Sequence, residues 1–266
     1  MGHWKSGLGA YPSGRESPVE GPVRCPLAGG ADGPEVVDSA DDDRHAATPE
    51  GRVVPAPPIR HRAPVTPPPE ARLAPVPYGE WDDHTREVLL SYLRRPEIYL
   101  SGAPDAPPMP IVLELFAHHL PLSDAWLAFS DMLASADARL APTHRELLIL
   151  RVAWRTRSGY EWNQHQRMGA AEGLNDAQIE AVREGPDSAV WTPEERSMLR
   201  AADEMIDRFS VSEETWQELA SWLNPAELFE LLFVVGGYLC LATVLNSIGL
   251  QAEMPADPAG PGVAAP

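Results

Sequence analysis

The sequence has few cysteines, a shortage of basic charge and no long uninterrupted apolar run. Cys25 and Cys240 are the only cysteines among 266 residues, too few for a disulfide framework or a four-thiolate zinc site. Acidic residues outnumber basic ones by 39 to 21, and the net charge is −18. We therefore expect neither nucleic acid nor an anionic membrane surface as the main partner. Without about 18 consecutive apolar residues, we expect no transmembrane helix. The first residues lack the apolar stretch of a secretory signal, which favours the cytoplasm.

Prolines are concentrated near the two ends of the chain. Of the 29 prolines, 15 lie within residues 1–80 and 4 within residues 255–266. Proline fixes φ and removes a backbone donor, so such segments form no regular helices or ladders. We predict a disordered proline-rich arm over residues 1–74, one folded domain over 75–252 and a disordered tail over 253–266.

The folded domain lacks turn dipeptides between alternating apolar runs, which makes strands unexpected. Helix-start signals recur instead, among them Ser123, Asn175, Thr192 with Glu195, and Asn224 with Glu227. The predicted fold class is therefore all-α. Apolar periodicity and these signals predict helices over 81–94, 110–119, 123–133, 143–154, 159–172, 175–183, 192–209, 212–222 and 224–249.

One helical segment combines apolar and chemically active side chains at three- and four-residue steps. This spacing places them on one helix face, and they are Ser158, Glu161, Trp162, His165, Met168 and Gly169. A carboxylate one turn before a histidine can accept its ring N–H and raise its basicity. If Trp162 excludes water, such a pair can transfer protons near neutral pH. The same Glu–His spacing is also typical of a surface pair with little energetic weight.

Other polar residues each have a structural alternative. Glu146 is placed to form a capping box with Thr143, in which case it would only bond the helix start. Tyr160 and Tyr238 are more often core aromatics than proton donors. His118 and His119 lack further ligands at metal spacing, which favours a solvated helix end and no metal site. Spacing alone leaves the function open.

Three runs together resemble the carboxymuconolactone decarboxylase family, which includes the alkylhydroperoxidase D-like proteins. They are Arg145-Glu-Leu-Leu-Ile-Leu-Arg-Val-Ala-Trp154, Tyr160-Glu-Trp-Asn-Gln-His165 and Ala171-Glu-Gly-Leu174, and the resemblance extends from about Pro75 to Gln251. The peroxidase branch carries Cys-x-x-Cys-x-x-x-His with a glutamate nineteen residues before the histidine. Here that glutamate corresponds to Glu146 and the histidine to His165, whereas Ser158 and Glu161 stand at the two cysteine positions.

The missing thiols determine which chemistry the resemblance implies. Peroxide reduction by a dithiol needs a low-pKa thiolate and a resolving thiol, so the chain is not expected to be a thiol peroxidase. The decarboxylase branch implies proton transfer without metal or organic cofactor. It also implies an all-α alkylhydroperoxidase D-like bundle that assembles as a homo-oligomer, a trimer or hexamer, with the pocket near subunit contacts.

The resulting hypothesis is a cofactor-independent acid/base enzyme of decarboxylase, isomerase, dehydratase or cyclase type. Its substrate would be a small carbonyl, lactone or polyketide-like compound of secondary metabolism. His165 would transfer the proton, supported by Glu161 and Glu146, with Tyr160 or Ser158 bonding the oxyanion. The residues expected to line the substrate pocket are Trp154, Trp162, Tyr238 and Asn246.

Two alternatives from other classes remain open. In the first, His165, Glu146 and Glu161 bind a metal in a metal-dependent lyase or hydrolase. In the second, the chain is a non-enzymatic ligand-binding or scaffold protein whose proline-rich arm recruits a partner.

Overall fold

The computed structural model describes residues 70–103 and 106–251, all within one compact unit, Ala56–Pro266. Most of the predicted arm and tail, including Cys25, lies outside the described residues. The described chain begins five residues before the predicted domain boundary. There the backbone N–H of Arg72 donates to the carbonyl oxygen of Ile248 at 2.7 Å, and its guanidinium donates to Ser247.

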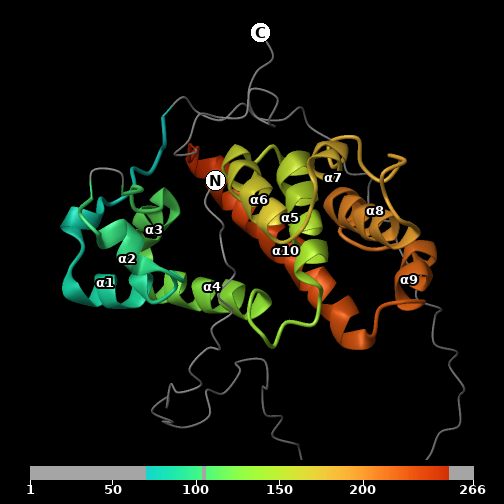
Figure 1. The fold of residues 1–266 in the computed structure, drawn as a ribbon, viewed down its shortest axis with the longest axis horizontal. Helices are drawn as coiled ribbons and strands as arrows, with labels where there is room; N and C mark the ends of the chain where they lie inside the picture. Colours follow the sequence, from blue (N-terminus) through green and yellow to red (C-terminus); the bar gives the residue numbers. More distant parts are fainter. Residues whose placement is uncertain (1–69, 104–105, 252–266) are drawn as a thin grey trace, which may run out of the picture. The chain divides into compact units, whose positions relative to one another are not determined.

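The described residues form an all-α structure without a strand, as predicted (Figure 1). A short 3₁₀ helix, Tyr78–Glu80, and another, Ala117–His119, accompany ten α-helices. The α-helices are α1 (Asp83–Leu90), α2 (Pro96–Leu100), α3 (Ile111–Phe116), α4 (Leu120–Leu133), α5 (Pro142–Thr156), α6 (Gly159–Ala171), α7 (Asp176–Ala181), α8 (Pro193–Arg208), α9 (Glu213–Ala220) and α10 (Pro225–Ile248).

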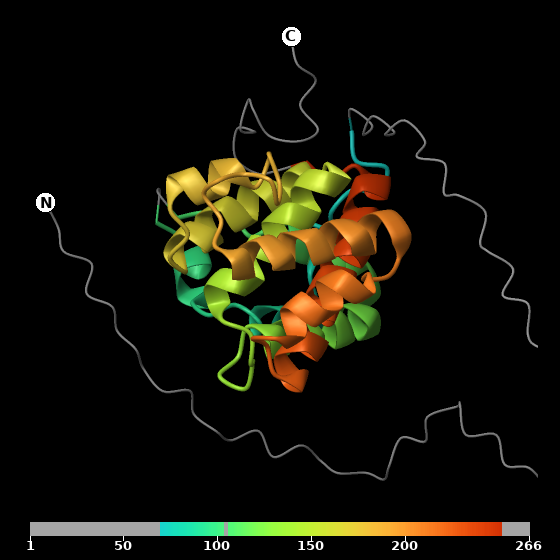
Figure 2. The same cartoon turned by 90° about the vertical axis from the view of Figure 1, so that its right-hand side faces the viewer.

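Helix α5 is the centre of the packing. It contacts α10, α6 and α8, and α8 in turn packs against α9. Figure 2 views the domain from the side that α8 and α9 cover. One face of α5 joins α8, α9 and α10 in the largest apolar cluster, and another face packs with α6 and α7 around the fully buried Trp162. The helix is thereby buried along nearly its whole length, which holds its polar side chains in a fixed environment.

Ion pairs between α5 and α8 add a directional link to this apolar packing. Arg151 forms a two-pronged ion pair with Asp203, with both N–O distances 2.7 Å, and donates to the carbonyl oxygen of Val182 at 2.6 Å. A side chain at Gly185 would collide with the Arg151 guanidinium, at 2.5 Å from its Cβ, and the φ of Gly185 is +89°. Glycine is therefore required at this position for two separate reasons.

Most predicted helix starts are confirmed. Asn175, Thr192 and Asn224 each form a capping box, and Ser212 accepts from the backbone N–H of Thr215. These local signals succeed because a cap satisfies backbone donors within three residues of itself.

Three local predictions are wrong. Ser123 does not cap α4, because the helix begins at Leu120 behind His119, whose Nδ1 accepts from the N–H of Leu122. Ser123 lies inside α4 and donates to the carbonyl oxygen of Phe116. The predicted helix over 81–94 ends at residue 90, and the separate short helix α2 follows it. The third wrong prediction is the capping box at the start of α5, whose glutamate belongs to the candidate site.

Helix α10 changes the expectation about membrane spans. By length and composition it could cross a membrane, since its best 18-residue window has a mean hydropathy of 2.2, and 39% of that window is buried. The absence of an uninterrupted apolar run was therefore too strict a test. A core helix passes the same test, and α10 packs against α5, α8 and α9, so this finding carries no conclusion about a membrane.

Candidate active site

The predicted histidine and glutamate meet between α5 and α6. His165 Nδ1 lies 2.7 Å from Glu146 Oε2, and both side chains are buried. The predicted capping box of Thr143 and Glu146 is wrong, because α5 starts after Ala141 with no side-chain cap. The Glu146 carboxylate instead crosses to the neighbouring helix. In the tautomer whose Nδ1–H donates to Glu146, Nε2 is the basic nitrogen of His165.

Arg145 completes this buried pair and was not assigned a role from the sequence. Its Nε lies 3.3 Å from Glu146 Oε1, and its guanidinium also donates to the carbonyl oxygen of Leu133 at 3.2 Å. A longer contact of 3.7 Å joins it to Glu172. Both oxygens of Glu146 are thus engaged, one by His165 and one by Arg145, and the carboxylate is held in one orientation. The only sequence signal for this role is the position of Arg145 next to Glu146, in the run that resembles the family.

A tight turn and a glycine bring the two helices together. Arg157 ends α5 in the left-handed region, with φ of 57°, and α6 begins two residues later. One turn beyond His165, Gly169 lies against α5: a Cβ there would come within 3.4 Å of Leu150 and 3.6 Å of the Glu146 Cβ. The small residue lets α6 approach closely enough for the His165–Glu146 hydrogen bond.

Glu161 is a second buried carboxyl group on α6. It is 2% exposed, and neither its oxygens nor the Ser158 hydroxyl has a hydrogen-bond partner among the described residues. Burial raises the pKa of Glu161 from its ordinary 4.5 to about 8, and the nearby Ser158 hydroxyl offsets only part of this effect. Glu161 is therefore protonated at neutral pH and can donate a proton.

Tyr238 approaches the histidine from α10. Its ring lies edge-on to His165, with centroids 5.1 Å apart and an interplanar angle of 89°. Burial raises the pKa of the Tyr238 hydroxyl, and the charges of Glu146 and Glu161 raise it further. The tyrosine thus remains a neutral hydrogen-bond donor beside the imidazole. Of the predicted pocket residues, it is the one with a described ring contact to His165.

The other predicted site residues occupy several environments. Trp162 is fully buried, its ring 5.3 Å from that of the half-buried Trp154. Tyr160 is buried in a cluster with Leu115, Leu245 and Leu250, the setting of a core aromatic. Asn246 ties α10 to the end of α5 by donating to the carbonyl oxygen of Thr156 at 2.8 Å. The substrate contacts of these four residues stay predictions.

The predicted common face of α6 is largely confirmed. Ser158, Glu161, Trp162 and His165 are all buried, and so is Gly169. Met168 differs, because it is 46% exposed. It therefore lies at the margin of this face, on the solvent side.

No group of three or more His, Cys, Asp or Glu residues in the described ranges is arranged to hold a metal ion. Glu146 is already engaged by His165 and Arg145, and Glu161 makes no contact that would complete a ligand set. His118 and His119 lie exposed, as predicted, and bond to Ala74 and Leu122.

Comparisons with known proteins concern the fold and one family model. Residues 121–204, from α4 into α8, match the model of the carboxymuconolactone decarboxylase family. This segment contains Glu146, Glu161 and His165. The helical domain is therefore similar to this family over its central helices. No curated protein sequence matches the chain.

Solved structures show the fold of this AhpD-like domain in other proteins. An uncharacterized peroxidase-related protein from Silicibacter sp. TM1040 is 17% identical, with a TM-score of 0.58 over 70% of this chain and 94% of that one. An AhpD-core peroxidase-related protein from Ralstonia eutropha JMP134 is 18% identical, with a TM-score of 0.57 over 68% and 92%. The debrominase Bmp8, solved with 2,3,4-tribromopyrrole, is 15% identical, with a TM-score of 0.52 over 69% and 92%. The predicted all-α AhpD-like fold is thus confirmed.

Proposed function

We propose that this AhpD-like protein is an acid/base enzyme that moves a proton on a small carbonyl, lactone or polyketide-like compound. The observation that carries the proposal is a buried histidine hydrogen-bonded to one buried carboxyl group, on a helix that carries a second buried carboxyl group without such a bond. Glu146 accepts a 2.7 Å hydrogen bond from His165, while Glu161 has no hydrogen-bond partner in the described chain and a pKa raised to about 8. A carboxyl group that burial keeps protonated is typical of a general acid.

The chemical step uses each group once. His165 Nε2 takes a proton from the carbon next to a carbonyl, and Glu146 stabilises the imidazolium through Nδ1. As electrons move to the carbonyl oxygen, Glu161 gives that oxygen its proton, so the substrate becomes a neutral enol. Return of the proton from His165 to another carbon, with the enol O–H proton going back to Glu161, isomerises the substrate and restores both groups. Loss of water from a β-hydroxy carbonyl follows when the hydroxyl leaves with the His165 proton while the enol proton returns to Glu161. In a β-keto acid the bond to the carboxylate breaks in place of the C–H bond, carbon dioxide leaves, and the freed electron pair forms the enol that Glu161 protonates. No external oxidant or reductant is required.

Thiol peroxidase chemistry is not proposed for this site. Ser158 and Glu161 stand at the two cysteine positions, and Cys240, the one cysteine in the described ranges, is an exposed residue of α10. A serine hydroxyl cannot form the sulfenic acid that peroxide reduction requires. The solved debrominase with a bound bromopyrrole supports only the idea that this fold accommodates small ring compounds.

The two alternatives differ in the support they have. A metal-dependent lyase or hydrolase has no three-residue ligand group in the described ranges to support it. The scaffold alternative rests on the proline-rich arm and needs no buried acid and base. Chelation would abolish activity only in a metal enzyme. Loss of residues 1–69 would abolish partner binding only in a scaffold.

The test measures exchange of C–H for C–D in D₂O, followed by proton NMR, on a panel of β-keto acids, lactones and cyclic ketones. His165→Gln should reduce exchange about 10²- to 10⁴-fold, the usual contribution of a general base. Glu161→Gln keeps the shape of the side chain but removes the carboxylic proton, so exchange should also fall in this variant. In the parent protein, activity should fall as pH rises through about 8, because Glu161 then loses its proton. Exchange that survives both substitutions contradicts the proposal.

The assembly predicted from the resemblance, a trimer or hexamer, stays a prediction. Sedimentation equilibrium of the full chain measures it directly. A mass of three or six times 29.0 kDa is the expected result, and a monomer at micromolar concentration would contradict it.

A further inference from the structure

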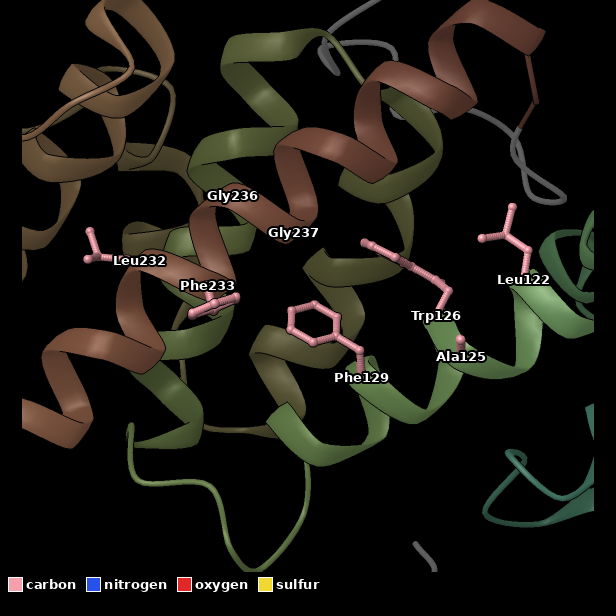
Figure 3. Close-up of a pocket in the computed structure, with 8 residues that line it drawn as sticks. All are labelled: Leu122, Ala125, Trp126, Phe129, Leu232, Phe233, Gly236 and Gly237. Carbon is pink, nitrogen blue, oxygen red and sulfur yellow. The ribbon is translucent and has the colours of Figure 1, made fainter. Parts of the chain in front are cut away.

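An apolar groove runs between α4 and α10. It has a volume of about 610 Å³ and contains Trp126 and Phe129 of α4 and Phe233 of α10. Figure 3 shows the rings of Trp126 and Phe129 projecting toward α10. Phe233 is 46% exposed, and Leu122 at the edge of the groove is 65% exposed. Such a large uncovered apolar surface indicates a binding site.

A second, smaller cavity extends this groove toward the end of α10. It measures about 280 Å³ and shares Leu122 and Trp126 with the first cavity, so the two are continuous. Its far wall contains Leu73, close to the first described residue of the chain, together with Cys240 and Ile248 of α10. The polar side chains in this wall are already used: Ser123 bonds to Phe116, and His118 to Ala74. The groove therefore favours apolar side chains in the part of the occupant that contacts it.

We propose that the groove binds a segment of the same chain, residues 56–69. The described chain is attached at the end of this groove, where the backbone of Arg72 bonds to Ile248 at 2.7 Å and the side chain of Leu73 lines the cavity. The sequence that precedes this attachment is Ala-Pro-Pro-Ile-Arg-His-Arg-Ala-Pro-Val-Thr-Pro-Pro-Pro, with six prolines among 14 residues and no acidic group. Proline-rich segments bind grooves lined by aromatic side chains, because their extended form loses little entropy.

The proposed segment is long enough to follow the whole groove. The α10 residues along both cavities run from Leu232 to Ile248, which is about 24 Å of helix at 1.5 Å per residue. An extended proline-rich chain rises about 3.1 Å per residue and covers that distance with about eight residues. Tethering also raises the effective concentration of the segment to the millimolar range, so even weak binding fills the groove. The basic residues Arg60 and Arg62 are attracted to a domain that carries most of the net charge of −18.

The native Cys240 allows a direct test in the full chain. It is exposed and lines the cavity next to Leu73. A variant with Cys25→Ser and Pro68→Cys contains two thiols, one in the groove and one at the residue of the proposed segment that a rise of about 3.1 Å per residue from Arg72 places beside Cys240. Under oxidised glutathione we expect a disulfide between them within one chain, identified by intact mass and peptide mapping.

The matched control fills the groove without changing the tether. A side chain at Gly236 would enter open space, since nothing lies within 4 Å of its Cβ. Adding Gly236→Leu should therefore slow disulfide formation about tenfold, because docking is blocked while the linker length is unchanged. Circular dichroism and the thermal midpoint check that the fold is retained.

Two results would overturn the proposal. Equal disulfide rates with and without Gly236→Leu would mean that the two thiols meet only through random motion of the tether. A disulfide between two chains as the main product, together with an oligomer that Gly236→Leu dissociates into monomers, would assign the groove to a second copy of the chain.

Discussion

The buried, unpaired carboxyl group of Glu161 makes the stability of this protein depend on pH in a specific way. Its pKa is raised from 4.5 to about 8 in the folded protein, and the cause is burial. In the unfolded chain the group is ionised above about pH 4.5. Between these values the folded state binds one more proton than the unfolded state, so stability falls as pH rises.

The size of the effect follows from the pKa values. Each pH unit between the two values costs about 1.4 kcal/mol. From pH 5 to pH 8 this group alone should lower the free energy of unfolding by about 4 kcal/mol. Above pH 8 the contribution levels off, because Glu161 is then ionised in both states.

The substitution Glu161→Gln isolates this contribution, because an amide of similar shape does not titrate. Urea unfolding of both proteins at pH 5 and pH 9 gives the difference in unfolding free energy at each pH. Any pH-independent cost of the amide cancels between the two conditions. The variant should gain about 4 kcal/mol relative to the parent protein as pH rises, whereas the exposed Glu214→Gln should show no such gain. A constant difference between Glu161→Gln and the parent would refute the assignment of a buried, protonated Glu161.

Two further predictions concern the structure around the site. Gly169→Ala should destabilise the protein by about 1–3 kcal/mol in urea unfolding, because its methyl group would lie 3.0 Å from Leu174 Cδ1 and 3.4 Å from Leu150 Cδ1 of α5, and these packed side chains would have to shift. An unchanged midpoint would contradict the close approach of the two helices. Thr192→Ala should cost about 1 kcal/mol by removing the capping box of α8, whereas Thr143→Ala should stay within about 0.5 kcal/mol because α5 has no side-chain cap. The thermal midpoints of the two variants test this difference. An equal loss of stability in both variants would mean that Thr143 does cap α5.

Local signals in the sequence were sufficient for most of the helices. The caps at Asn175, Thr192 and Asn224 bond donors within three residues, so neighbouring residues alone define them. The same reasoning failed at Thr143, where the spacing of a capping box was present but Glu146 bonded elsewhere. A side chain that can satisfy either a local or a distant partner is decided by the packing of the helices.

By itself, the sequence determined that the folded domain is all-α and that the prolines lie mainly outside it, and its resemblance to a known family predicted Ser158 and Glu161 at the positions of the two thiols. Only the tertiary structure decided what the remaining groups do. The packing of α6 on α5 joined His165 to Glu146 across nineteen residues. It also buried Glu161 without a partner, which raises its pKa to about 8. Charge state depends on the water and charges around a group, and these are set by residues distant in the chain.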